Sequence, residues 1–130
     1  MLTIGLLISS GSNANKAAPS GTIVLNPGSI TQLGGIVWFD WIASRIPGGP
    51  KSDPRIQVLC YQGTLLVYGE AGPADHIFLL GGASSSWLNG TSGADPYAGA
   101  HCVADLYYWS YKGTQQFNLL ASVEFDAVGL

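Results

Sequence analysis

Residues 100–109 constrain the fold of this chain more than any other stretch. Their sequence, AHCVADLYYW, alternates two kinds of side chain. One face is mostly apolar and consists of Ala100, Cys102, Ala104, Leu106 and Tyr108. The other face is mixed and consists of His101, Val103, Asp105, Tyr107 and Trp109. A period of two with aromatic and β-branched residues predicts a strand. We therefore expect a central strand with a core on one side and partial cover, by loops or a partner, on the other.

Turn signals divide the chain from residue 21 onwards into further short strands. Because 18 glycines and seven prolines interrupt the sequence, we expect no long helices. Besides residues 100–109, the expected strands are residues 22–25, 36–43, 55–62, 65–69, 76–80 and 117–125. About seven short strands without a helical pattern predict an all-β fold, a β-sandwich with Greek-key connections. In that topology, residues 55–62 and 100–109 are neighbouring strands of one sheet.

Two of these strands have a predicted inward face. In residues 36–43 the inward side chains are expected to be Val37, Phe39, Trp41 and Ala43. In residues 117–125 they are expected to be Leu119, Ala121, Val123 and Phe125. Residues 63–64 predict a tight turn, so that the strands on either side of them form a hairpin. Residues 81–99 form a long connection that is rich in Gly, Ser and Asn.

The first 20 residues differ from the rest and predict an N-terminal arm, followed by one domain over residues 21–130. Residues 9–20 are mostly Ser, Gly, Asn and Ala, which is typical of a flexible linker. The arm has an apolar tip with one face made of Leu2, Ile4, Leu6 and Ile8. We expect this tip to dock on its own domain, on a sister copy or on another protein. The alternative, a secretion signal, would lack the positively charged leading segment of such signals.

The charge of the chain argues against two classes of partner. The net charge is −3 and the five Lys and Arg residues are scattered, so nucleic acid is not an expected partner. No run reaches the roughly 18 apolar residues of a membrane span, so a membrane is not expected either. Charged residues make up only 10% of the chain, against about 25% in average soluble domains. So low a charge indicates assembly with other proteins, or else a monomer with a Ser-, Thr- and Gly-rich surface.

The two cysteines, Cys60 and Cys102, fall on the apolar faces of neighbouring predicted strands. Three interpretations are open. A disulfide is geometrically feasible, although strained across adjacent strands, and it would form outside a reducing cytoplasm. Two unlinked thiols would instead pack as small hydrophobic side chains. Half of a metal site is disfavoured, because zinc takes about four ligands and His101 lies on the opposite face of its strand.

No combination of residues in the sequence indicates catalysis. His76 and His101 are the only histidines, and Asp75 points to the face opposite its neighbour His76 if both lie on a strand. No Gly-x-Ser-x-Gly motif is present, and residues 81–82 lack the lysine and the helix of a phosphate loop. One alternative stays open, a carboxylate pair for glycoside cleavage among Asp95, Asp105 and Glu124. We expect a protein that is not an enzyme and that holds no cofactor or metal.

Aromatic residues are the remaining candidates for a binding surface. They are Trp38, Trp87, Tyr97, Tyr107 and Trp109. On the surface of a β-sandwich, Trp and Tyr side chains either stack on sugar rings or anchor a protein interface, where both are enriched. In a third interpretation, residues 81–99 fold back so that Trp87 and Tyr97 cover the outer face of a sheet. We favour this third interpretation for Trp87.

Four segments of the sequence resemble a known family. They are PRIQVLCYQG from residue 54, VYGEAGP from residue 67, FLLGGASSSW from residue 78 and CVADLYYW from residue 102. Together they resemble the immunoglobulin-like domains of small virion proteins from tailed phages of actinobacteria, over about residues 20–127. The resemblance implies an immunoglobulin-like β-sandwich and a non-enzymatic structural role on a capsid or a tail.

The resemblance also sets the expected function. We expect a virion structural protein, most specifically a decoration protein that binds the outer surface of a phage capsid and stabilises it. Its partners would be the major capsid protein, sister copies of the chain, or both. The alternative function is a tail-borne or secreted adhesion module, located outside the cell, that binds glycan through its Trp and Tyr side chains.

Overall fold

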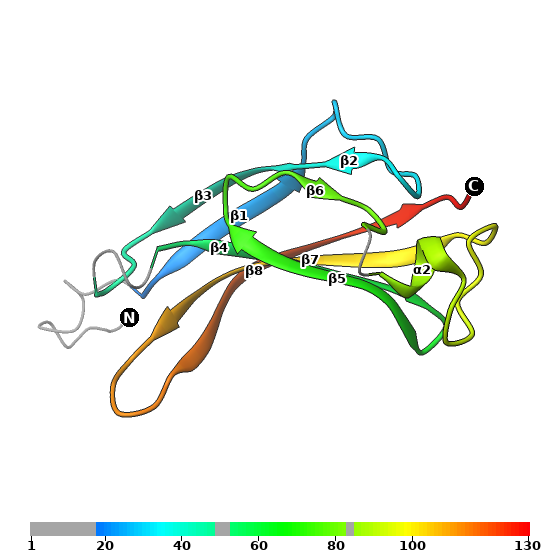
Figure 1. Cartoon of the computed structure of the whole chain (residues 1–130). Coiled ribbons are helices and arrows are strands. Elements are labelled where there is room, and N and C mark those ends of the chain that lie inside the picture. The colour runs from blue at the N-terminus through cyan, green and yellow to red at the C-terminus, as the bar shows by residue number, and fades with distance from the viewer. Residues whose placement is uncertain (1–17, 49–52, 83–84) are drawn as a thin grey trace, which may run out of the picture.

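The computed structural model describes residues 18–48, 53–82 and 85–130, which form mainly β-strands (Figure 1). In chain order the elements are β1 (Ser20–Leu25), β2 (Ile36–Val37), β3 (Phe39–Ser44), β4 (Arg55–Gln62), β5 (Leu65–Pro73), β6 (Phe78–Leu79), α2 (Ser86–Asn89), β7 (Ala100–Ser110) and β8 (Gln116–Ala127). The strands pair with one another in antiparallel fashion. The prediction of an all-β fold is confirmed.

The largest sheet contains four strands in the order β5-β4-β7-β8. β4 and β5 form the hairpin that was expected around residues 63–64. β4 also pairs with β7, as predicted, and Cys60 lies directly opposite Cys102. The two short sheets, β1–β3 and β2–β6, lie over one face of this sheet in Figure 1, so the strands form two layers.

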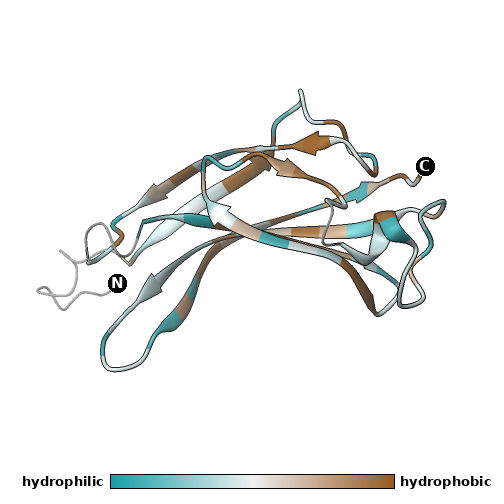
Figure 2. Ribbon diagram, in the orientation of Figure 1, coloured by the Kyte–Doolittle hydropathy of each residue, from teal (hydrophilic) through white to brown (hydrophobic). Residues whose placement is uncertain are grey.

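The hydrophobic core lies between the two layers and follows the period of two in the sequence. Hydrophobic and hydrophilic residues alternate along several of the strands (Figure 2). The buried residues that share this core include Ile23, Val37, Phe39, Ile56, Val58, Cys60, Phe78, Cys102, Ala104 and Leu106. Each fully buried Val, Leu, Ile or Phe side chain contributes about 1.5–3 kcal/mol, before the conformational entropy that folding costs. The inward faces expected for β7 and for Val37 and Phe39 are confirmed.

A β-bulge changes the inward face of β8. Leu106 of β7 pairs with Ala121, but the next residue, Tyr107, pairs with Leu119, so Leu120 is the extra residue. Leu120 packs against the core, whereas Leu119 is 56% exposed. The expectation that Leu119 points inward is therefore wrong, because the bulge reverses the alternation at this point.

The first strand passes close to this bulge. A Cβ atom on Gly21 would lie 2.9 Å from the carbonyl oxygen of Ile42, 3.0 Å from Cδ2 of Leu106 and 3.1 Å from Cβ of Leu120. Only glycine leaves room for such an approach. The absence of a side chain at residue 21 thus lets β1 lie close against β7 and β8.

The bounds of several strands also differ from the prediction. Residues 36–43 form two strands, β2 and β3, because the hydroxyl of Ser29 accepts a hydrogen bond from the Trp38 N–H and donates one to the Trp38 carbonyl. The strand expected at residues 65–69 continues to Pro73, and the one expected at residues 76–80 shortens to β6.

The described part of residues 81–99 contains one short helix, α2, which the sequence pattern did not indicate. The Ser85 hydroxyl caps it by accepting a hydrogen bond of 3.1 Å from the Trp87 N–H. Gly90, with φ of 64°, ends it in the left-handed conformation. A preceding Ser and a following Gly are usual helix ends, but four residues are too few to show a helical period.

The N-terminal arm lies almost entirely outside the described residues, and with it the expected docking side chains Leu2, Ile4, Leu6 and Ile8. The described chain begins at residue 18, and β1 begins at Ser20. Within the described ranges, no helix has the length and apolar character needed to cross a membrane.

Candidate functional site

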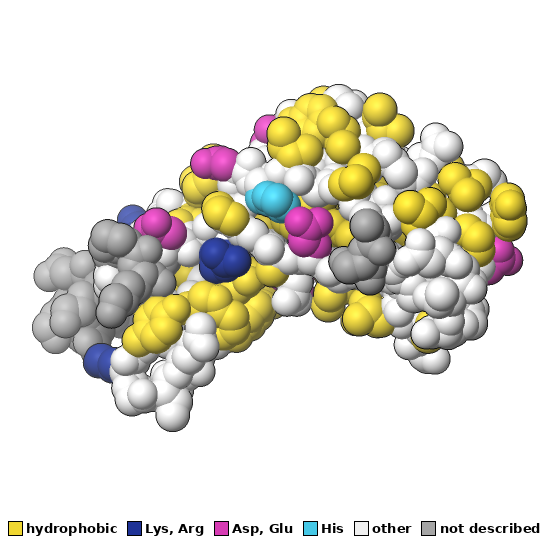
Figure 3. Space-filling model, in the orientation of Figure 1, with side chains coloured by type: hydrophobic (Ala, Val, Ile, Leu, Met, Phe, Trp, Pro, Cys, Tyr) yellow, Lys and Arg dark blue, Asp and Glu magenta, His cyan; other side chains and the backbone are white. Residues whose placement is uncertain are grey.

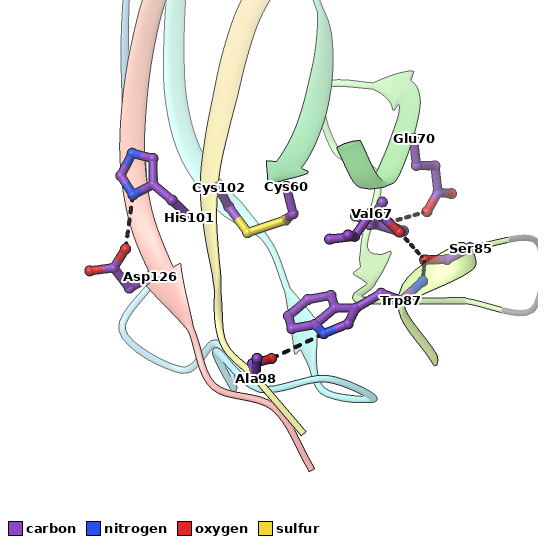
Figure 4. Close-up of a disulfide and its surroundings, with 10 residues drawn as sticks. Cys60, Val67, Glu70, Ser85, Trp87, Ala98, His101, Cys102 and Asp126 are labelled. Atoms are coloured by element: carbon purple, nitrogen blue, oxygen red, sulfur yellow. Dashed lines mark hydrogen bonds and ion pairs between the residues drawn. A yellow bond between two sulfur atoms is a disulfide. The ribbon is translucent and has the colours of Figure 1, made fainter. Parts of the chain in front are cut away.

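Cys60 and Cys102 form a disulfide that joins β4 to β7 (Figure 4). Their Cα atoms are 4.0 Å apart, and both side chains are fully buried in the core. Of the three interpretations of these cysteines, the structure thus contains the disulfide. Because neither sulfur is exposed, we assign the pair a structural role in tying the two central strands together.

Trp87 lies beside this disulfide and not on the surface. Its side chain is fully buried, and Figure 4 shows the indole pointing into the core near the Cys60–Cys102 bond. The indole N–H donates a hydrogen bond of 3.2 Å to the carbonyl of Ala98, so the ring holds two parts of residues 81–99 together. The prediction of Trp87 as an interface aromatic is therefore wrong, and so is the favoured interpretation that it covers the outer face of a sheet, because its ring lies inside the core.

Tyr107 is also buried, although it lies on the outer face of the four-stranded sheet. It pairs with Arg55 across the β4–β7 ladder, and its phenol oxygen accepts a hydrogen bond of 3.3 Å from Arg55 Nε. Phe117 stacks on its ring at 4.4 Å, and Trp109 contacts it edge-on at 5.5 Å. Only 2% of Tyr107 is exposed, so the prediction of Tyr107 as an interface aromatic is wrong as well.

Trp109 completes this aromatic cluster, which we define as Tyr107, Trp109 and Phe117. The ring centroids of Trp109 and Phe117 are 5.7 Å apart, in a T-shaped arrangement. The cluster forms because Trp109 pairs with Phe117 across the β7–β8 hairpin and Tyr107 lies two residues earlier on the same face. Trp109 itself stays partly exposed and is the one ring of the cluster that borders a cleft.

The cleft has a volume of about 330 Å³ and is called the hairpin cleft below. It is lined by Asp53, Pro54, Arg55, Pro73, Trp109, Tyr111 and Gln115. These residues meet because β4 runs antiparallel to both β5 and β7, so that the start of β4 lies beside the ends of its two neighbours. In Figure 3, hydrophobic side chains gather beside a basic side chain towards this end of the molecule.

The hairpin cleft carries both signs of charge. Asp53 is exposed and Arg55 is half-buried. Within the described part of the chain, neither the Asp53 carboxylate nor the Arg55 Nη atoms have a hydrogen-bond partner, since Arg55 uses only Nε. Gln115 Nε2 donates a weak hydrogen bond of 3.4 Å to the Tyr111 hydroxyl. The cleft thus offers hydrogen-bond donors and acceptors next to an aromatic surface.

Besides the hairpin cleft, the outer face of the four-stranded sheet carries a second set of polar side chains, centred on His101. Its Nδ1 lies 2.8 Å from Asp126 Oδ1, and its Nε2 contacts Glu124 Oε1. Hydrogen bonds to Asp126 and then to Glu124 raise the pKa of His101 above its usual value of 6.5. All three groups are exposed, and no cluster of His, Cys, Asp and Glu in the described residues has the arrangement of a metal site.

The other histidine belongs to a hydrogen-bonded row that sequence reasoning missed. His76 Nε2 lies 2.6 Å from Glu70 Oε2, and the Tyr68 hydroxyl donates to Glu70 Oε1 at 2.6 Å. Burial, and then the hydrogen bond to Glu70, raise the pKa of Tyr68 far above its usual range, so the phenol stays neutral. The row arises because β5 continues past residue 69, where the expected strand ended. Asp75 instead accepts a hydrogen bond from the Trp41 indole at 3.2 Å.

The remaining predicted aromatics do not join the hairpin cleft. Trp38 is half-buried, and its ring lies against the turn at Gly28, where a Cβ atom would be 2.9 Å from Cζ2. Tyr97 is 76% exposed, but it precedes β7, whereas Trp109 lies near the end of that strand. A strand rises about 3.3 Å per residue, so the fold separates these two side chains along the length of β7.

The fold and the cleft together define an all-β protein of two antiparallel layers, with one buried disulfide between neighbouring strands of the larger sheet and a mixed aromatic and polar cleft at one end. Comparison with known protein families, curated proteins and solved structures found no match to this chain.

Proposed function

We propose that this chain is a non-enzymatic structural protein of a virion, in which an immunoglobulin-like domain binds the outer surface of a phage capsid and stabilises it. The proposal starts from the resemblance of four segments of the sequence to virion proteins of actinobacterial phages. Its support within the molecule is an exposed apolar surface on the layer that does not contain the disulfide.

That surface, the outer apolar patch, consists of Ile30, Ile36, Ile77 and Leu79. These side chains are between 41% and 56% exposed. Ile36 and Leu79 pair directly between β2 and β6, and the Ile30 N–H donates to the Ile36 carbonyl at 2.8 Å. Contiguous exposed apolar groups are typical of surfaces that contact another protein. Docking on capsid subunits would remove this patch from water.

The disulfide supports a location outside a reducing cytoplasm. Disulfides persist in extracellular settings and on virion surfaces, whereas cytoplasmic thiols are kept reduced. A protein that closes the Cys60–Cys102 bond after cell lysis would gain stability at the time when the virion leaves the cell.

The experiment measures the number of copies of the protein on purified virions. We expect a copy number near that of the capsid protein, and Leu79→Asp to lower it by about tenfold or more, because a charge would be buried at the contact. Leu66→Asp is the matched control, since Leu66 is 47% exposed against 48% for Leu79 but lies on β5 of the other layer. Equal losses in both variants, or only a few copies per virion of the unaltered chain, would contradict the proposal.

A second candidate function is an adhesion module, carried on a tail or secreted, that binds glycan. The observation that favours it is the hairpin cleft, since one of the predicted aromatics, Trp109, lines a hollow together with charged and amide side chains.

A further inference from the structure

We propose that the hairpin cleft is a saccharide-binding site in which a pyranose ring packs against the indole of Trp109. This inference rests on the second candidate function, glycan binding, and is independent of the capsid proposal, because the cleft and the outer apolar patch share no residue. It assigns one ligand class, saccharides, to a site at the start of β4 and the ends of β5 and β7.

The cleft has the size and composition of a small-ligand site. Such sites are hollows of about 300–1,000 Å³ in which aromatic surface is combined with a few placed polar groups. The hairpin cleft, at about 330 Å³, lies at the lower end of that range. Its aromatic members are Trp109 and Tyr111, and its polar members are Asp53, Arg55 and Gln115.

The Trp109 ring is held in place before any ligand arrives. Tyr107 and Phe117 contact it at interplanar angles of 86° and 78°, and they stack on each other at 24°. Aromatic pairs in these geometries are favourable beyond the area they bury. Because the neighbouring rings fix the indole, a ligand that packs on it pays little for ordering this side chain.

The walls of the cleft are similarly restrained. Pro54 and Pro73 have fixed φ angles, and the Ala74 N–H donates to the Pro54 carbonyl at 3.1 Å. Arg55 pairs with Pro73 on one side and with Tyr107 on the other, and its Nε bond to the Tyr107 hydroxyl directs the guanidinium. The sheet therefore positions the guanidinium of Arg55, whereas Asp53 lies just before β4 and Gln115 in the turn between β7 and β8.

The charges of the cleft select the ligand class. A carboxylate at Asp53 repels phosphates and other anions that Arg55 alone would attract, and Arg55 likewise repels cations that Asp53 would attract. A neutral molecule with several hydroxyls satisfies both, because each hydroxyl donates to a carboxylate and accepts from a guanidinium or an amide. A pyranose also presents a C–H face for the indole, which a neutral polar chain without a ring does not.

The test uses the full-length oxidised protein and methyl glycosides of glucose, galactose, mannose and N-acetylglucosamine. Binding is followed by NMR of the four tryptophan indole N–H signals, assigned by substitution. We expect at least one glycoside to shift the Trp109 signal with a dissociation constant on the order of 1 mM, as for other small polar ligands. Asp53→Ala should weaken binding by about tenfold or more through loss of its hydrogen bonds.

One control variant keeps the test specific. Tyr97→Ala removes an aromatic ring that is 76% exposed but lies away from the cleft, and it should leave binding unchanged. Asp53→Ala is preferred over Trp109→Ala as the main variant because Asp53 is exposed and has no partner among the described residues, so the fold is retained.

Three results would overturn the inference. The first is the absence of any Trp109 shift with all four glycosides. The second is a shift with inorganic phosphate that Asp53→Ala strengthens, which would identify an anion site at Arg55. The third is loss of capsid attachment in Asp53→Ala without any glycoside binding by the unaltered protein, which would make the cleft a protein contact. Failure of the capsid proposal alone would leave the glycoside shifts in place.

Discussion

His101 illustrates how much of the surface chemistry of this protein depends on single residues. Its ring stands between the carboxylates of Asp126 and Glu124, which lie two residues apart on β8 and therefore on the same face of the sheet. Both ring nitrogens contact a carboxylate, so the doubly protonated imidazolium, which donates from both nitrogens, is the favoured form.

At this scale we predict that His101 titrates above 6.5. The hydrogen bonds to Asp126 and Glu124 raise its pKa in the folded state. A raised pKa means that the interaction stabilises the fold fully below the unfolded value of about 6.5 and that this contribution is lost as the pH rises through the folded pKa. An NMR titration of the imidazole protons measures this pKa directly.

The same titration in Asp126→Asn and Glu124→Gln provides the comparison. Each substitution should move the midpoint back towards 6.5, and Asp126→Asn should have the larger effect because Asp126 is the leading cause of the shift. A midpoint at or below 6.5 in the unaltered protein would show that the two carboxylates do not hold the ring.

Among the elements, the β7–β8 hairpin has the largest effect on where side chains lie. Its bulge turns Leu120 towards the core and Leu119 towards water, and beyond the bulge the hairpin carries the aromatic cluster and the far wall of the hairpin cleft. A bulge commonly redirects side chains near functional sites. Without the extra residue, Leu119 would take the inward position that simple alternation assigns to it.

We therefore predict opposite outcomes for two adjacent leucines. Leu120→Ala should lower the free energy of unfolding by about 1–3 kcal/mol, because it removes methyl groups that pack on the core. Leu119→Ala should change it by less than about 0.5 kcal/mol, since that side chain is 56% exposed. Urea denaturation of the two variants beside the unaltered protein makes the comparison, and a larger loss for Leu119→Ala would mean that the bulge is absent.

At the scale of the whole molecule, the described domain and the N-terminal arm raise separate questions. The core, the disulfide and the hairpin cleft all lie in residues 18–130 as described. Residues 1–17, when extended, would span at most about 60 Å, which is enough to reach beyond the domain. Burying Leu2, Ile4, Leu6 and Ile8 would contribute roughly 1.5–3 kcal/mol for each side chain before the cost of ordering the tether.

We predict that deleting residues 1–17 leaves the domain folded but weakens its attachment to capsids or its self-association. The deletion stops before Ser20, which pairs with Ser44, so that β1 keeps its full length. A thermal melt reports on folding, and co-sedimentation with capsids together with size-exclusion chromatography reports on assembly. A much lower melting temperature would place the tip in the core of its own domain, and no change in either measurement would remove the arm from the assembly mechanism.

Features with a local signal could be predicted from the residues alone. Alternation placed Cys60 and Cys102 on inward faces, and the turn at residues 63–64 marked the β4–β5 hairpin. The expected order of strands placed β4 beside β7, so that Cys60 and Cys102 were expected to lie close together. These features depend on a period of two and on turn residues, which act over a few positions of the chain.

Features that depend on contacts between distant residues could not be predicted and became apparent in the folded chain. The bulge at Leu120 is a matter of register between two strands, and the burial of Trp87 depends on where residues 81–99 cross the end of the core. The hairpin cleft joins Asp53, Pro73 and Gln115, which no local pattern connects. Register and close contact are settled by the free energy of the whole core, to which each residue contributes little by itself.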